Sequence, residues 1–195
     1  MIARMSFAAS IAVFTASALA AVEIQFTPGA GTEAYRKVLI APAQVEFNRE
    51  FFEDAKPMPG QPRRFSPNQV EALSREMGES FRNALVDAFR QHGFEIALAP
   101  GNDVLRISPA LKDLNVNTPK GPRPWRFYAR KAGEATMVVE GSDASGARLL
   151  RASRQATAGE TAALQPASDA SNRFWFDAMF RDWAEDLVSA LAGAK

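Results

Sequence analysis

The chain contains no cysteine and only one histidine, His92, among its 195 residues. Without cysteine there is no disulfide bond, thiolate zinc site, iron–sulfur cluster or cysteine nucleophile. A single histidine excludes every mechanism in which one chain must supply two. The motifs G-x-S-x-G, H-E-x-x-H, G-x-x-x-x-G-K-[ST] and G-x-G-x-x-G are also missing, which disfavours the enzyme classes that carry them. We therefore expect a protein that is not an enzyme and that holds no cofactor or metal.

The chain also has little net charge, because 23 Lys and Arg are balanced by 22 Asp and Glu. Such a protein has no overall field to steer it to nucleic acid, so we expect no nucleic-acid partner. With 47% hydrophobic and 23% charged residues, the composition is that of a globular protein. A membrane helix needs roughly 20 consecutive apolar residues, and no apolar run in the chain is long enough to be a convincing membrane span. We therefore expect no transmembrane segment in the mature protein.

The first twenty residues are typical of an export signal. Arg4 supplies a positive charge, the segment from Phe7 to Thr15 is mostly apolar or small, and Ala18-Leu19-Ala20 has the pattern of a signal-peptidase site. We expect cleavage before Ala21 and a mature protein that is periplasmic or secreted. A lipid anchor would need a cysteine after the cleavage site, so we expect none. A buried N-terminal helix is the alternative interpretation.

The remaining chain predicts a loose N-terminal lead-in over residues 21–34 and a single domain over residues 35–195. Within the domain, apolar and polar residues alternate as in strands. These strands are expected at 37–47 with an interruption at Pro42, and at 94–99, 105–116, 136–140 and 148–156. The residues from Asp143 to Gly146 predict a hairpin turn. The segment 48–65 shows no clear period, and we expect a surface loop there.

Two amphipathic helices complete the predicted domain. Ser66, Pro67 and Gln69 form a capping-box pattern at the start of the first helix, and Gly93 is placed to end it. The second helix is expected to start near Ser168 or Ser171. The apolar stripes are Val70, Leu73, Met77, Phe81, Leu85, Ala88 and Phe89 in the first helix, and Phe176, Phe180, Trp183, Leu187 and Leu191 in the second. The pattern predicts a two-layer α+β fold, with a mainly antiparallel four- to five-stranded sheet covered by the two helices.

Three blocks of this layout form a familiar combination: residues 35–47, residues 103–117 and residues 139–146. Together they resemble the bacterial envelope family called domain of unknown function 3313, over residues 35–191. Many members of that family are described as lipoproteins and have a cysteine after the signal, where this chain has Ala21. The resemblance implies an envelope protein, and it supplies no activity and no catalytic residues.

The segment from Lys120 to Lys131 is the one local concentration of charge, because no acidic residue lies between Asp113 and Glu134. Arginine binds phosphate or carboxylate through paired hydrogen bonds, and aromatic side chains add stacking surface. We therefore take this segment as a candidate binding site, the alternative being a solvated connection whose aromatic side chains fold onto the sheet. Its candidate residues are Lys120, Arg123, Trp125, Arg126, Tyr128, Arg130 and Lys131.

Other polar and aromatic residues have simpler explanations. His92 lies at the end of the first helix, where a cation interacts favourably with the helix dipole. Glu140 and Asp143 could serve as a hydrolytic carboxylate pair, but Asp143 is better explained as a turn residue. Trp175 points away from the second helical stripe and is the aromatic residue expected to be partly exposed.

These observations favour a soluble, periplasmic, non-enzymatic binding or scaffolding module of the cell envelope. The expected partner is an envelope protein or an anionic envelope polymer or lipid headgroup. The first alternative is a binder of an anionic envelope ligand through residues 120–131. The second is a carboxylate-based glycan hydrolase.

Overall fold

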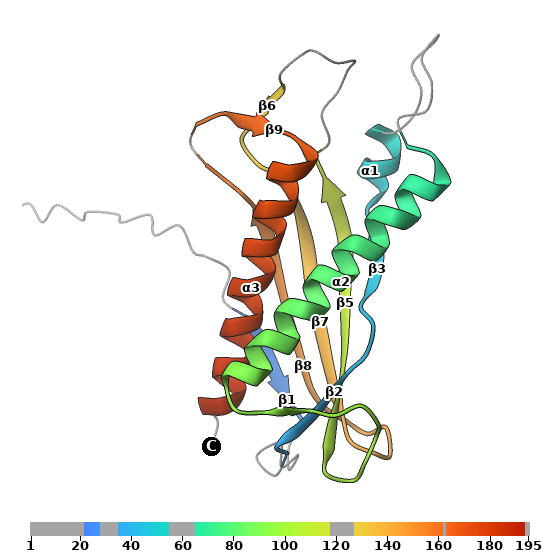
Figure 1. Cartoon of the computed structure of the whole chain (residues 1–195), viewed down its shortest axis with the longest axis vertical. Coiled ribbons are helices and arrows are strands. Elements are labelled where there is room, and N and C mark those ends of the chain that lie inside the picture. The colour runs from blue at the N-terminus through green and yellow to red at the C-terminus, as the bar shows by residue number, and fades with distance from the viewer. Residues whose placement is uncertain (1–21, 28–34, 55–64, 118–126, 162, 194–195) are drawn as a thin grey trace, which may run out of the picture.

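The computed structural model describes residues 22–27, 35–54, 65–117, 127–161 and 163–193. A seven-stranded sheet carries two long helices side by side on one face (Figure 1). The sheet strands are β1 (Glu23–Phe26), β2 (Lys37–Ile40), β3 (Gln44–Phe47), β4 (Glu95–Ile96), β5 (Val104–Val116), β7 (Gly133–Ser142) and β8 (Arg148–Ala158). A separate ribbon pairs β6 (Phe127–Ala129) with β9 (Gln165–Ala167), and the helices are α1 (Arg49–Asp54), α2 (Pro67–Gln91) and α3 (Asp169–Gly193).

The predicted α+β class is confirmed, but the sheet is mixed and larger than expected. Its order is β1-β8-β7-β5-β2-β4, with β3 also pairing β5. The pairs among β1, β8, β7 and β5 are antiparallel, whereas β2 and β3 run parallel to β5 and β2 runs parallel to β4. The expectation of four to five mainly antiparallel strands is therefore wrong in detail. The reason is that α2 carries the chain back across the sheet, so β4 enters in the direction of β2. The connection over residues 97–103 then returns the chain, so β5 also starts in that direction.

Two irregularities keep apolar side chains in the core. Pro42 interrupts the first predicted strand as expected, and the chain continues along β5 as β3. In β5 the register shifts between Lys112 and Asn115, and Asp113 has a φ of 52°. Because side chains alternate between faces along a regular strand, this bulge lets both Leu111 and Leu114 be fully buried.

Helix α2 begins and ends as the sequence predicts. The backbone N–H of Gln69 donates to Oγ of Ser66 at 3.3 Å, and the N–H of Ser66 donates to Oε1 of Gln69 at 2.8 Å. At the other end Gly93 has a φ of +80°, and the N–H of Phe94 donates to the carbonyl of Phe89 at 2.9 Å. These bonds satisfy backbone groups that a helix end otherwise leaves without partners.

The core lies between the sheet and the two long helices. The ring of Phe81 in α2 lies 5.3 Å, centre to centre, from each of Phe180 and Trp183 in α3. All three side chains are fully buried. The predicted stripes are therefore confirmed, except that Val70 and Leu73 are only half-buried.

Two segments that the sequence predicts to be irregular are ordered elements. Within the predicted loose lead-in, β1 pairs with β8 at the edge of the sheet, with Ile24 opposite Ala152. Within the predicted surface loop, α1 buries Phe51 to 2% exposure. Its ring stacks on Phe47 at 4.5 Å and on Phe65 at 5.2 Å. A four-residue strand and a six-residue helix are too short to show a clear period, which explains both errors.

Candidate functional site

Only part of the predicted basic and aromatic segment lies among the described residues. Tyr128 belongs to β6, opposite Pro166 of β9, and its side chain is 53% exposed. Arg130 is exposed, and Nζ of Lys131 lies 2.7 Å from Oε2 of Glu134. Lys131 therefore already has a surface partner. The other predicted residues lie outside the described part of the chain: Lys120, Arg123, Trp125 and Arg126.

The candidate carboxylate pair sits at the end of the β7–β8 hairpin, in contact with neighbouring groups. Oδ1 of Asp143 accepts hydrogen bonds from the hydroxyl and backbone N–H of Ser145, at 2.7 and 2.8 Å, and from the N–H of Ala147 at 2.9 Å. The Ser145 hydroxyl is the main cause that lowers the pKa of Asp143 below its usual value. Oε1 of Glu140 accepts from Arg151 at 3.3 Å. Asp143 is thus the turn residue that the sequence favours.

His92 has the end-of-helix position expected for it. It caps α2, and its Nε2 lies 2.8 Å from Oε1 of Glu185 in α3. The contact connects the end of α2 to α3, which is a structural role.

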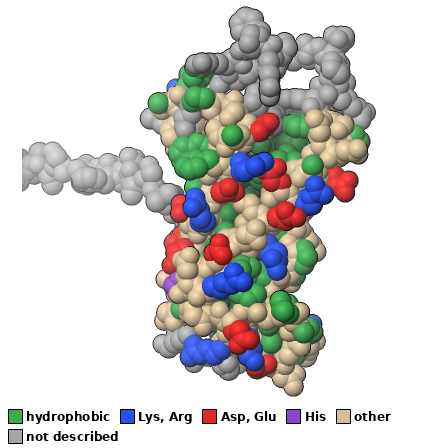
Figure 2. Space-filling view, viewed as in Figure 1, with side chains coloured by type: hydrophobic (Ala, Val, Ile, Leu, Met, Phe, Trp, Pro, Cys, Tyr) green, Lys and Arg blue, Asp and Glu red, His purple; other side chains and the backbone are tan. Residues whose placement is uncertain are grey.

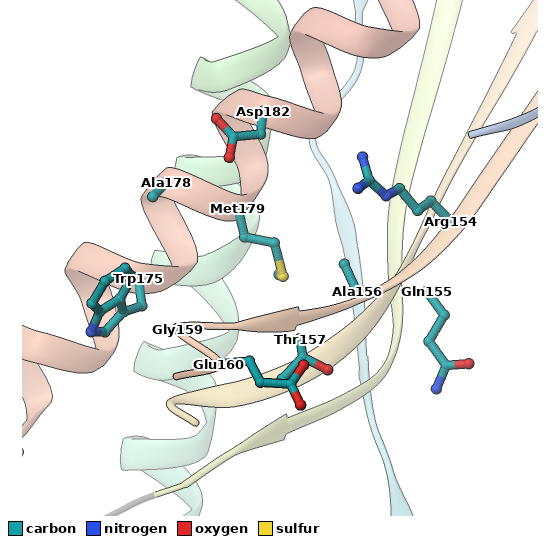
Figure 3. A pocket seen from close by; sticks show the side chains of 10 residues that line it. All are labelled: Arg154, Gln155, Ala156, Thr157, Gly159, Glu160, Trp175, Ala178, Met179 and Asp182. Atoms are coloured by element: carbon teal, nitrogen blue, oxygen red, sulfur yellow. The ribbon is translucent and has the colours of Figure 1, made fainter. Parts of the chain in front are cut away.

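A groove that sequence reasoning missed lies between α3 and the end of β8 (Figure 3). Its volume is about 630 Å³, within the 300–1,000 Å³ typical of small-molecule sites. One wall comes from α3 and the other from β8 and the turn after it. The lining residues are Arg154, Gln155, Ala156, Thr157, Gly159, Glu160, Trp175, Ala178, Met179 and Asp182.

Trp175 closes one end of this groove by resting on Gly159. Gly159 has a φ of +65°, and a Cβ added there would lie 2.5 Å from Cγ of Trp175. Both the backbone conformation and the close approach of the indole require glycine at this position. The expectation of partial exposure for Trp175 is confirmed, since its side chain is half-buried. The sequence predicted that Trp175 lies off the apolar stripe of its helix, but no sequence signal predicted its contact with Gly159.

The charged residues of the groove divide into one that is paired and two that are not. Arg154, whose side chain is 16% exposed, donates from Nη1 to Oδ2 of Asp186 at 2.8 Å. Its Nε is buried without a hydrogen-bond partner among the described residues. Glu160 and Asp182 are exposed, and neither has a hydrogen-bond or ion-pair partner in the described parts of the chain. Among the described residues that line the groove, the unpaired charge is therefore negative.

A second depression, between α2 and α3, has about 610 Å³. Contacts between its own residues bridge it, namely the ion pair of Glu76 with Arg173 and the hydrogen bond from Ser80 to Asp177. Figure 2 shows acidic and basic side chains interspersed over this face.

No three metal-ligating carboxylate or histidine side chains come together within the described residues, and no helix in that part of the chain is long and apolar enough to cross a membrane.

The family model described as "Protein of unknown function (DUF3313)" matches residues 6–187, nearly the whole chain. The chain belongs to this family. The resemblance seen in the sequence is thus confirmed. A comparison of the DUF3313 chain with curated proteins finds no match.

Several solved structures are similar to the DUF3313 chain at low identity. The PelC dodecamer from Paraburkholderia phytofirmans is 13% identical, over 87% of this chain and 97% of that one, with a TM-score of 0.44. A DUF4136 family protein from Bacteroides thetaiotaomicron is 11% identical, over 89% and 97%, with a TM-score of 0.44. A minor lipoprotein from Acinetobacter baumannii is 11% identical, over 82% and 92%, with a TM-score of 0.34. At these identities and scores, none of the three assigns a role to a residue of the groove.

Proposed function

We propose that this DUF3313 protein is a non-enzymatic binding or scaffolding module of the bacterial envelope, exported to the periplasm, and that the groove between α3 and β8 is its binding site. The pattern typical of an export signal in residues 1–20 supports the location. The observation that carries the binding role is the groove itself, where Trp175 and two carboxylates that have no partner among the described residues border one concave space. Binding sites typically combine an apolar or aromatic lining with a few polar groups in this way.

Site-specific photo-crosslinking in intact cells tests this proposal. A photo-reactive amino acid at Ala178, which lines the groove on α3, should give discrete adducts that mass spectrometry can identify. The matched control is Ser108, an exposed β5 residue whose strand position alternates with the buried Ile107. Adducts at Ala178 and not at Ser108 would support the groove. Adducts only at Ser108 would move the site to the other face of the sheet, and adducts at neither position would contradict a binding role.

A second candidate is the binding of an anionic envelope ligand by the basic and aromatic segment 120–131. The described end of this segment supports it, because the side chains of Tyr128 in β6 and of Arg130, just after that strand, are exposed. Arginine and tyrosine together suit a phosphate or carboxylate group.

A further inference from the structure

We infer that the groove between α3 and β8 takes a small organic cation, an ammonium or guanidinium group carried on an apolar body. This inference rests on the proposed binding role of the groove and adds the chemical class of its ligand. It follows from the charge, the lining and the rigidity of the groove.

The charge of the groove favours a cation. Asp182 projects from α3 and Glu160 from the turn after β8, so the two carboxylates belong to opposite walls (Figure 3). Among the described lining residues Arg154 is the one cationic side chain, and it is held 2.8 Å from Asp186. Because that ion pair is neutral as a unit, Asp182 and Glu160 carry the unpaired charge among the described lining residues. An anion would be repelled, while a cation would gain two counter-charges.

The remaining lining suits the apolar body of such a ligand. Trp175 and Met179 border the groove from successive turns of α3, with Ala178 beside them. The electron-rich faces of indole rings attract cations, and the flexible thioether of methionine packs against ligands of varied shape. A ligand with a charged end and an apolar end would therefore find a matching surface for each.

The groove is also held in shape before any ligand arrives. Trp175 rests on the backbone of Gly159, and α3 is anchored by Phe176, Phe180 and Trp183, all fully buried. Little conformational entropy would be lost at this wall when a ligand binds. Its volume of about 630 Å³ corresponds to a small molecule.

Three probes of similar shape and different charge test the inference on the purified protein. They are 2-phenylethylamine (cationic), 2-phenylethanol (neutral) and 3-phenylpropanoate (anionic), with binding measured by titration calorimetry and by chemical shifts of groove residues. We expect the amine to bind at least about tenfold more tightly than the alcohol, a difference of about 1.4 kcal/mol. The anion should show no binding, and added salt should weaken binding of the amine.

Two variants locate the effect. Asp182→Asn should weaken binding of the amine about fivefold or more and leave binding of the alcohol unchanged. Glu79→Gln is the matched control, because it removes one exposed charge from α2 outside the groove and should leave both affinities unchanged.

An alcohol or anion that binds as tightly as the amine would overturn the inferred charge preference. Failure of all three probes to bind would overturn the ligand class. In both cases crosslinks formed at Ala178 would still support the groove as a binding site. Absence of those crosslinks is the separate result that contradicts the proposed function.

Discussion

Replacing Gly159 with alanine should destabilise the protein through two separable effects. The first is backbone strain, because Gly159 has a φ of +65° and a left-handed conformation costs a residue with a Cβ about 1–2 kcal/mol. The second is steric, because the new Cβ would lie 2.5 Å from Cγ of Trp175 and 2.7 Å from its Cδ2. Forcing a packed side chain to shift typically costs about 1–3 kcal/mol. The expected total is about 2–5 kcal/mol.

The chain provides a control that isolates the contact with Trp175. Gly146 has a φ of +89°, and a Cβ added there would meet nothing within 4 Å. Gly146→Ala should therefore show the backbone strain alone, about 1–2 kcal/mol. The free energy of unfolding is measured for both variants by urea denaturation. In a domain of this size each kcal/mol corresponds to about 2–4 °C in Tm, so the two variants should differ by several degrees.

A double-mutant cycle completes the argument. In a Trp175→Ala background the clash at Gly159 disappears, so Gly159→Ala should cost only about as much as Gly146→Ala. The coupling energy between the two positions then measures the energy of the steric clash between the added methyl group and the indole. Equal destabilisation by Gly159→Ala and Gly146→Ala in the parent protein would refute the reasoning, since it would show that the indole does not rest on Gly159.

Three further predictions concern the core, the hairpin and the basic segment. Phe81→Ala and Trp183→Ala should each lower the free energy of unfolding, measured by urea denaturation, by about 3–5 kcal/mol. Because the two rings lie 5.3 Å apart, the double variant should lose less than the sum of the two single losses. Unfolding of both single variants like the parent protein would contradict a shared core. The pKa of Asp143 is lowered in the folded protein, so the carboxylate stabilises the fold above the usual pKa of 3.8, and this stabilisation is lost as pH falls through the lower folded value. Asp143→Asn should therefore flatten the acid side of the curve of Tm against pH. An unchanged curve would contradict this. Replacing Arg123 and Arg126 together with serine should leave Tm unchanged but weaken partner recovery, more at low salt than at high salt, whereas a collapse in Tm would make these side chains structural.

The helices could be predicted from the sequence because the signals that define them are local. Ser66 and Gln69 are three residues apart, and Gly93 directly follows the residue that caps the helix. The apolar stripes repeat over many turns, which makes the period unambiguous. The hairpin at Asp143 is local in the same sense, since its carboxylate bonds to groups two and four residues on.

The direction of the strands could not be predicted because it depends on distant contacts. A short connection joins β4 to β5, yet the two strands lie on opposite sides of β2. Only the pairing of β2 with both neighbours decides that all three strands are parallel. Strands of two and four residues, such as β4 and β2, carry too few side chains to specify their partners.

The groove escaped prediction for the same reason, since its parts meet only when α3 packs on β8. Two contacts shape the groove, Arg154 with Asp186 and Gly159 with Trp175. Each joins β8 or the turn after it to α3. Neither pair has a spacing that a helix or strand period would reveal. Contacts between residues so far apart in the chain cannot be identified from a single sequence.

Where β8 borders the groove, it presents the small side chain of Ala156 to a helix that carries Trp175 and Met179. Ala152, Ala156 and Ala158 lie on the side of β8 that packs against α3, together with Leu150 and with Arg154, which pairs with Asp186 of α3. Alanine fills little of the space between a sheet and a helix, and protein interiors tolerate few voids. Trp183 fills that space at the centre of the core, where it is fully buried. Near Trp175 the same space stays open to solvent, so one helix both completes the core and forms a wall of the site.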